Sequence, residues 1–240
     1  MRQAIAFLLF IFLAHSLSAG SPGYWHGKER ELRYTPEGDD FVIVNGNKRF
    51  NRALYGTNTA FRVETGDLPE FGLFMPGMGG NIQLGILAGN ESLWLNHAEY
   101  VESRYRAGSR VYTIKDPVLG TGELLITALA MADAEGIILE IVPINIPGNL
   151  ELVTIFGGAS NRGFSRNGDL GVDGPEAFSL RADDCTGNRY KIEANTFSLV
   201  YGADTRSGPR TTVGVFSPGT KVKLGSPYAM QTVAAVTASH

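Results

Sequence analysis

Three carboxylates lie within seven residues and form the most suggestive chemical pattern of the sequence. Glu64, Asp67 and Glu70 fall in the stretch VETGDLPE. Glycoside hydrolysis uses a pair of carboxylates, one as acid and the other as base or nucleophile. The same stretch also fits a plain turn, because Gly66 tolerates a positive φ angle and Pro69 fixes the exit of the chain. We treat the three as candidate catalytic residues and keep the turn as the alternative.

Polar and aromatic residues that suit sugar binding surround these carboxylates. Aromatic planes pack on the apolar faces of sugar rings, while amides and charged groups bind the hydroxyls. The candidate substrate-binding residues are Arg52, Arg62, Asn81, Trp94, His97 and Tyr100. Each also has a structural interpretation. Arg62 can pair with Glu64 on one strand face, Asn81 can cap a turn, and Trp94 can be buried in an edge strand.

Other catalytic and metal-binding patterns are weak. MPGMGGN lacks the Lys-Ser/Thr ending of a phosphate-binding loop, and no G-x-S-x-G is present. No second histidine lies near His97, so we expect no zinc site and no cofactor. Asn167, Asp169 and Asp173 in loop 161–176 could offer oxygens to calcium, although their spacing is not that of an EF-hand.

The single cysteine, Cys185, cannot form an internal disulfide. We expect it to be buried as a small apolar residue. A catalytic thiol would need a partner base, for which His97 is a candidate.

The charge balance argues against nucleic acid as a partner. Lys and Arg number 21 against 24 Asp and Glu, without a basic cluster. Beyond the first 20 residues, no basic amphipathic stretch predicts membrane binding.

Residues 1–20 have the layout of a secretory signal peptide. Arg2 precedes an apolar run from Ala4 to Ala14, and small residues follow in SLSAG. The run is too short to span a bilayer as a helix. We therefore expect an exported protein, periplasmic or extracellular.

The rest of the chain has the sequence pattern of an all-β protein, with short strands separated by turns. Short apolar runs are separated by many of the 30 glycines, and no 3.6-residue period persists. This predicts a large two-sheet antiparallel β-sandwich over residues 21–230, without a long helix. We expect residues 231–240 to be a linker or the start of another domain.

Three local predictions accompany the sandwich. Asn45-Gly46 predicts a tight hairpin between Phe41–Val44 and a return strand from Lys48. GIILEIVPIN, apolar on both faces, predicts a central strand that is covered on both sides. Charged and apolar residues alternate in TKVKLG, which predicts a strand with one solvent-exposed face.

Long segments of the chain resemble a known family. FNRALYGTNTAFRVETGD and PEFGLFMPGMGGN, and more loosely DLGVDGPEAFSL and DCTGNRYKI, resemble the domain of unknown function 4450 family. Its members are exported, glycoside-hydrolase-like proteins of Gram-negative gut bacteria. The resemblance implies an N-terminal β-sandwich that packs on a helical-barrel domain carrying the catalytic acid.

Three hypotheses follow from these patterns. The first is an accessory β-sandwich of a polysaccharide-degrading protein, with an apolar patch for a helical domain. The second is a free-standing carbohydrate-binding module, with exposed aromatics such as Trp94, Tyr100 and Tyr105. The third is a small glycosidase with two convergent carboxylates. In each, a polysaccharide or oligosaccharide is the expected partner.

Overall fold

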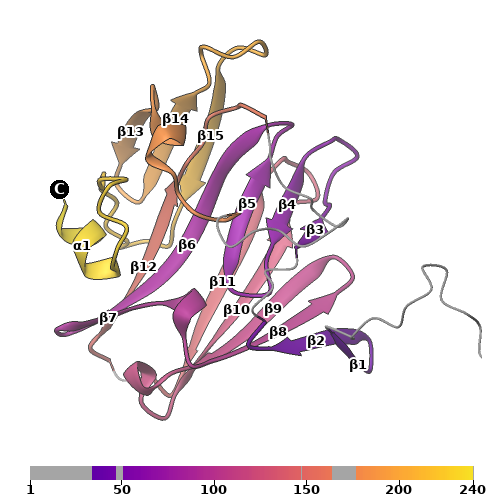
Figure 1. The fold of residues 1–240 in the computed structure, drawn as a ribbon, viewed down its shortest axis with the longest axis vertical. Helices are drawn as coiled ribbons and strands as arrows, with labels where there is room; N and C mark the ends of the chain where they lie inside the picture. The colour runs from indigo at the N-terminus through magenta and orange to yellow at the C-terminus, as the bar shows by residue number, and fades with distance from the viewer. Residues whose placement is uncertain (1–33, 47–50, 147, 164–176, 240) are drawn as a thin grey trace, which may run out of the picture. The chain divides into compact units, whose positions relative to one another are not determined.

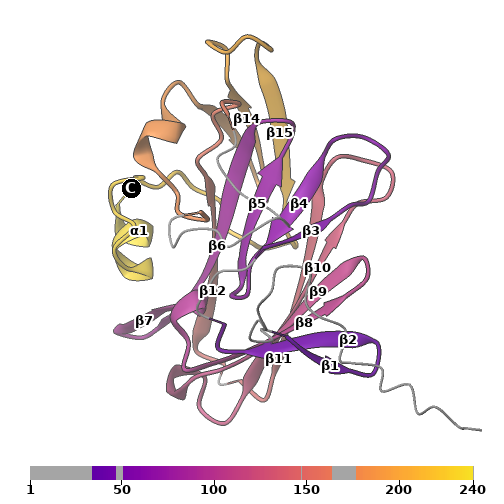
Figure 2. The ribbon, with the colours of Figure 1, turned by 45° about the vertical axis from the view of Figure 1, so that its right-hand side comes forward.

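The computed structural model describes residues 34–46, 51–146, 148–163 and 177–239. All of them belong to one compact unit, Arg33–His240. Figures 1 and 2 show this unit from two directions.

The first sheet has six antiparallel strands in the order β1-β2-β8-β9-β10-β11. Its strands are β1 (Thr35–Glu37), β2 (Asp40–Val44), β8 (Tyr100–Arg106), β9 (Ser109–Lys115), β10 (Glu123–Ala130) and β11 (Ile137–Ile144). Buried residues alternate along the central strands, as in the burial of Tyr112 and Ile114 on β9. This alternation is typical of strands with one face on a core.

The second sheet also has six strands, and its long central strand β6 has neighbours on both edges. The order is β12-β6-β5-β4-β3, and β7 also pairs with β6. Its strands are β3 (Arg52–Leu54), β4 (Arg62–Thr65), β5 (Glu70–Phe74), β6 (Met78–Ala88), β7 (Glu91–Trp94) and β12 (Leu150–Gly157).

The two sheets pack face to face around one apolar core. The core takes Ile82, Leu84 and Ile86 from β6 and side chains such as Tyr112 from the first sheet. Phe71 meets Tyr112 edge to face, with ring centroids 5.8 Å apart. Burial of each such side chain stabilises the fold by about 1.5–3 kcal/mol. The predicted all-β sandwich class is therefore confirmed.

A smaller third sheet adds to the predicted two. Its three strands are β13 (Arg189–Glu193), β14 (Thr196–Tyr201) and β15 (Arg210–Val215). Phe197 stacks on Phe156 of β12 with centroids 5.2 Å apart, and it belongs to a second apolar cluster with Leu199 and Tyr201.

The helical elements of the described residues are all short. They are the 3-10 turns η1 (Leu95–His97), η2 (Pro117–Leu119) and η4 (Ala182–Cys185) and the α-helix α1 (Val233–Ala238). None of them is long enough to cross a bilayer. In both ribbon views α1 lies beside β6 and β7 (Figures 1 and 2), and it contacts both strands.

The predicted hairpin at Asn45-Gly46 is wrong. The strand before it, β2, pairs with β1 and β8, and the next strand, β3, belongs to the other sheet. Asn45 does adopt a positive φ of 49°. Its side chain, however, bonds the backbone of Glu99 and Val101 on the neighbouring segment, which ties β2 to β8 instead of closing a hairpin.

The predictions for two other strands are also wrong. GIILEIVPIN forms β11, but β11 lies at an edge of its sheet and exposes Ile138 and Val142. The stretch TKVKLG forms no strand. Val222 instead packs against the apolar cluster of the third sheet without joining its ladder.

The C-terminal segment has a defined conformation. Thr232 caps α1 by accepting a hydrogen bond from the backbone of Ala235 at 3.0 Å. Whether residues 231–240 lead into another domain stays a prediction.

Candidate functional site

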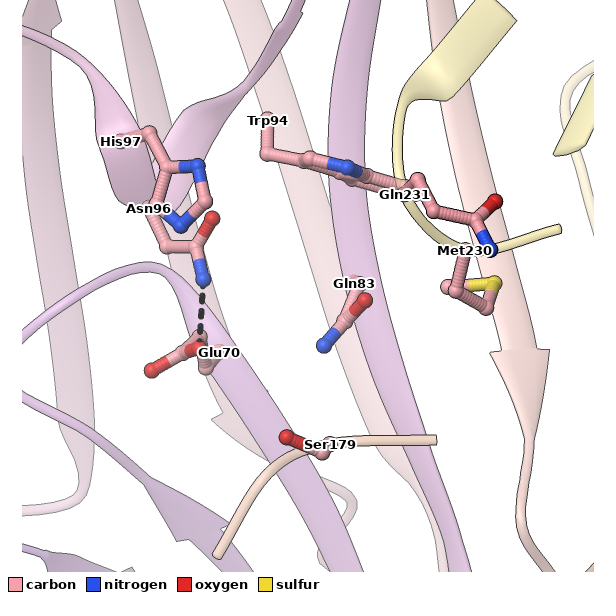
Figure 3. A pocket seen from close by; sticks show the side chains of 8 residues that line it. All are labelled: Glu70, Gln83, Trp94, Asn96, His97, Ser179, Met230 and Gln231. Carbon is pink, nitrogen blue, oxygen red and sulfur yellow. Dashed lines mark hydrogen bonds between the residues drawn. The ribbon is translucent and has the colours of Figure 1, made fainter. Parts of the chain in front are cut away.

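A polar pocket lies on the outer face of the second sheet, away from the core. Its cavity measures about 190 Å³. Figure 3 shows the eight lining side chains, which come from five parts of the chain. They are Glu70, Gln83, Trp94, Asn96, His97, Ser179, Met230 and Gln231.

Strand register explains why Glu70 and Trp94 meet. Strands β5 and β7 follow one another along the same edge of β6. Glu70 lies opposite Gln83, and Trp94 lies opposite Gly85. Gln83 and Gly85 are two residues apart on β6, so all these residues share one face of the sheet. The core residues Ile82, Leu84 and Ile86 occupy the other face.

The turn η1, directly after Trp94, brings two more polar groups to the pocket. Asn96 donates from Nδ2 to Oε1 of Glu70 at 2.6 Å. Glu70 is only 1% exposed, so this bond holds a buried carboxylate at the floor of the pocket. His97 lies at the exposed rim (Figure 3).

The segment 177–180 crosses the outer face and is fixed by two amides of β6. Asn81 donates to the carbonyl of Ser179 at 2.9 Å, and Gln83 donates to that of Phe178 at 3.2 Å. Phe178 is fully buried and anchors the segment. Ser179 is thereby held at one side of the pocket.

The C-terminal segment supplies the remaining wall, with Met230 and Gln231 before α1. Val233 and Val236 of this helix pack on Trp94. Gly85 makes the contact possible, because a Cβ atom there would lie 2.4 Å from Cγ2 of Val233. Trp94 is consequently only 8% exposed.

The pocket gathers three of the sequence candidates, Glu70, Trp94 and His97. Asn81 lies on the same sheet face and fixes the segment 177–180. Five lining residues were not among the candidates: Gln83, Asn96, Ser179, Met230 and Gln231. Only Gln83 had a sequence signal, because it alternates with the apolar residues of NIQLGIL.

Asp67 belongs to a separate buried cluster. Tyr34 donates to Oδ1 of Asp67 at 2.5 Å, and Arg110 donates to the Tyr34 hydroxyl at 2.6 Å. Arg110 and Tyr112 also donate to the Gly66 carbonyl, at 3.0 and 2.8 Å. Burial is the main cause that raises the pKa of Tyr34 to about 12. The cluster ties the turn between β4 and β5 to the first sheet.

The remaining candidates are engaged in contacts outside the pocket. Arg62 pairs with Glu64 and stacks over the Phe74 ring at 3.9 Å. Arg52 lies 5.8 Å from the centroid of the Tyr34 ring.

Tyr100 lies on the first sheet, and its hydroxyl donates to Oε2 of Glu102 at 3.1 Å. Tyr105, on the same strand β8, lies opposite Phe41 of β2. The three aromatics proposed as a binding row therefore lie on two different sheets.

Cys185 is half-buried rather than fully buried. It accepts a hydrogen bond from the Gly158 backbone at 3.4 Å, and burial raises the pKa of its thiol. Within the described residues, no group of His, Cys, Asp and Glu side chains could hold a metal ion. The calcium candidates Asn167, Asp169 and Asp173 lie outside these residues.

Fold and pocket together define an antiparallel β-sandwich with a polar pocket on one outer face. Residues 75–240 match the family described as Domain of unknown function (DUF4450), and the chain belongs to this family. No curated protein compared with the chain is similar to it.

Proposed function

We propose that this chain is an accessory β-sandwich of an exported polysaccharide-degrading protein, and that its pocket binds carbohydrate without cleaving it. The observation that carries the proposal is the composition of the pocket. It combines a fixed carboxylate, three amides and an indole, which are the groups that bind sugar hydroxyls and ring faces.

The carboxylates argue for binding over hydrolysis. Among the described residues, Glu70 is the one carboxylate that lines the pocket, whereas hydrolysis normally needs two about 5–10 Å apart. Asp67 lies in the buried cluster with Tyr34 and Arg110, and Glu64 pairs with Arg62.

A small glycosidase is the second candidate, and one observation favours it. Glu64 lies opposite Gly72 on β5, so its side chain shares a sheet face with Glu70. Both residues are nearly inaccessible, at 0% and 1% exposure. Glu64 is not among the described residues that line the pocket, so a substrate held there would not reach both carboxylates.

The accessory role requires a surface for a helical partner domain, as the family resemblance implies. The outer face of the first sheet offers apolar residues at Leu129, Ile138 and Val142, which are 37–48% exposed. Exposed apolar patches of this kind mark protein interaction surfaces. Export rests on the predicted signal peptide, residues 1–20, which lies outside the described residues.

A glycan array tests the proposal when released sugar is assayed in the same wells. We expect the purified chain to bind at least one glycan and to release no sugar. Release that is abolished by Glu64→Gln or Glu70→Gln would establish the glycosidase instead. Failure to bind any glycan would contradict carbohydrate recognition by this pocket.

A further inference from the structure

Strand β11 lies at the end of the first sheet, and the turn before it shows which of its backbone groups point outward. The backbone N–H of Met131 donates to the Gly136 carbonyl at 2.9 Å, so these two residues form a hydrogen-bonded pair. Such pairs recur at every second residue of an antiparallel ladder, and Leu129 with Ile138 is the next. Even-numbered residues of β11 therefore bond β10, and odd-numbered residues direct their N–H and C=O groups to the open edge.

Three apolar residues, Ile137, Leu139 and Ile141, supply the groups at this open edge. Among the described strands β11 pairs only with β10, and no described residue forms a hydrogen bond with the outward backbone groups of these three. Their side chains face the core, but each is only partly buried. The edge thus combines available backbone groups with apolar side chains that a further strand would cover.

Pro143 determines how far such a strand can pair. It is the next odd-numbered residue of β11, so its nitrogen, which carries no hydrogen, faces the open edge. A proline on an edge strand stops pairing at that point, because the ladder lacks a donor there. The usable edge is therefore confined to residues 137–141, and this segment is symmetric about Leu139.

A second copy of the same strand is complementary to this edge. With Leu139 opposite Leu139 of the second copy, Ile137 lies opposite Ile141, and each of these pairs can exchange two backbone hydrogen bonds. Apolar side chains then meet on the core face, and on the other face Glu140 lies opposite Ile138. Centring the pair on Glu140 would oppose two carboxylates, and centring it on Ile138 would leave Ile141 outside the ladder. Leu139 is therefore the favoured centre.

From these observations we propose that two copies of this chain form a symmetric dimer by antiparallel pairing of β11 with β11. The two six-stranded first sheets then join into one continuous sheet. The same surface serves on both copies, as in other isologous interfaces. The dimer goes beyond the proposed function, because it requires neither the pocket nor a partner domain.

Hydrogen exchange of single amides, measured by NMR on dilute and concentrated samples of the purified chain, tests this pairing. Ile138 and Glu140 donate to β10, so their amides should be protected in both samples. The amides of Ile137, Leu139 and Ile141 should exchange freely in the dilute sample and about tenfold more slowly in the concentrated one. Sedimentation velocity of the same samples shows which of them contains the dimer.

A proline at the centre of the edge separates backbone pairing from side-chain contact. Leu139→Pro removes the N–H that points to the second copy, whereas the ladder with β10 does not use this donor. Leu139→Ala is the matched control, because it shortens the same side chain and keeps the donor. We expect the dimer dissociation constant of Leu139→Pro to be about tenfold higher than that of Leu139→Ala. Thermal melting checks that both variants fold.

The exchange pattern and the variants distinguish the possible arrangements. Protection of the three outward amides only in the concentrated sample, with a dimer that Leu139→Pro weakens, supports the pairing. A chain that stays monomeric overturns it, and so does a dimer in which these amides exchange freely, because association then uses another surface. Protection in both samples also overturns it, since the edge is then covered within one chain. If Leu139→Pro does not fold, the exchange comparison decides.

Discussion

Arg110 is a fully buried arginine, and its contacts explain why it is tolerated between the two sheets. It donates to the Tyr34 hydroxyl and the Gly66 carbonyl and lies 3.8 Å from Asp67. Within the described residues, Nε and Nη1 have no hydrogen-bond partner, so desolvation of the guanidinium is only partly offset. The fold therefore depends strongly on the contacts that Arg110 does make.

Removal of this side chain should be severely destabilising. Arg110→Ala opens a cavity and takes a cation away from a buried carboxylate, so we expect a loss of about 3–5 kcal/mol in the free energy of unfolding. Urea denaturation followed by circular dichroism measures the loss. Arg106→Ala is the matched control. Its side chain is 63% exposed and pairs with Asp40, so it should cost less than about 1 kcal/mol. Equal losses in the two variants would contradict this account.

The raised pKa of Tyr34 predicts how the free energy of unfolding changes at alkaline pH. Burial raises the pKa of its phenol to about 12, compared with about 10 in the unfolded chain. Between these values the unfolded state has lost the phenolic proton and the folded state retains it, so stability falls as the pH rises. We expect Tyr34 to contribute a loss of about 2–3 kcal/mol between pH 10 and 12.

Unfolding by urea at several pH values measures this loss. Tyr34→Phe should make the decline between pH 10 and 12 less steep, whatever its effect at neutral pH. Tyr228→Phe, at a tyrosine that is 76% exposed, should leave the decline unchanged. Parallel declines in the wild type and Tyr34→Phe would show that the phenol titrates normally in the folded chain.

At the scale of elements, the position of α1 depends on Gly85, which has no side chain to push the helix away. A Cβ atom at Gly85 would lie 2.4 Å from Val233, so Gly85→Ala should displace the helix from Trp94. We expect a red shift of tryptophan fluorescence and weaker glycan binding, because Met230 and Gln231 move with the helix. Adding Val233→Ala to this variant should restore the fluorescence, since it removes the clashing methyl groups. Gly148→Ala, where no atom lies within 4 Å, is the control.

Persistence of the wild-type spectrum in Gly85→Ala would mean that α1 does not depend on this contact. Failure of Val233→Ala to restore the spectrum would place the strain elsewhere in the sheet.

Strand identity could be predicted wherever alternation and turn residues agree. NIQLGIL, SRVYTIKD and GELLITALAM all form strands because their apolar residues fall on one face and glycine or polar residues bound them. Alternation alone was insufficient for TKVKLG, where Val222 packs on the third sheet without a ladder partner. Hydrophobicity likewise did not determine position within a sheet. β11 is apolar on both faces and still lies at an edge.

The pocket could be predicted only in part. Glu70, Trp94 and His97 drew attention through their chemistry, but their convergence depends on how β5 and β7 share one edge of β6. Both pairings are hairpins between consecutive strands, and the register depends on the exact length and geometry of the turns at 75–77 and 89–90, which the sequence pattern alone does not define. Met230 and Gln231 reach the pocket only because α1 docks on Gly85, a contact between residues almost 150 positions apart in the sequence.

At the scale of the whole sandwich, the pocket and the apolar surface lie on opposite outer faces. The pocket faces outward from the second sheet, and the apolar residues of β10 and β11 face outward from the first. Leu129 lies opposite Ile138, and Leu125 lies opposite Val142, with the pair Thr127 and Glu140 between them on the same face. A domain bound there would leave the pocket accessible, which is the arrangement that an accessory binding domain requires.

This surface predicts how the isolated chain behaves in solution. Without a partner, apolar residues on an edge strand promote self-association. We expect sedimentation velocity to show concentration-dependent association of the wild type that Ile138→Lys reduces, with less than about 0.5 kcal/mol change in stability. Asn90→Lys is the control. This polar residue lies in the exposed turn between β6 and β7, so a charge there should have no effect. A wild type that stays monomeric at every concentration, or a reduction by Asn90→Lys as well, would contradict the assignment of β10 and β11 as the docking face.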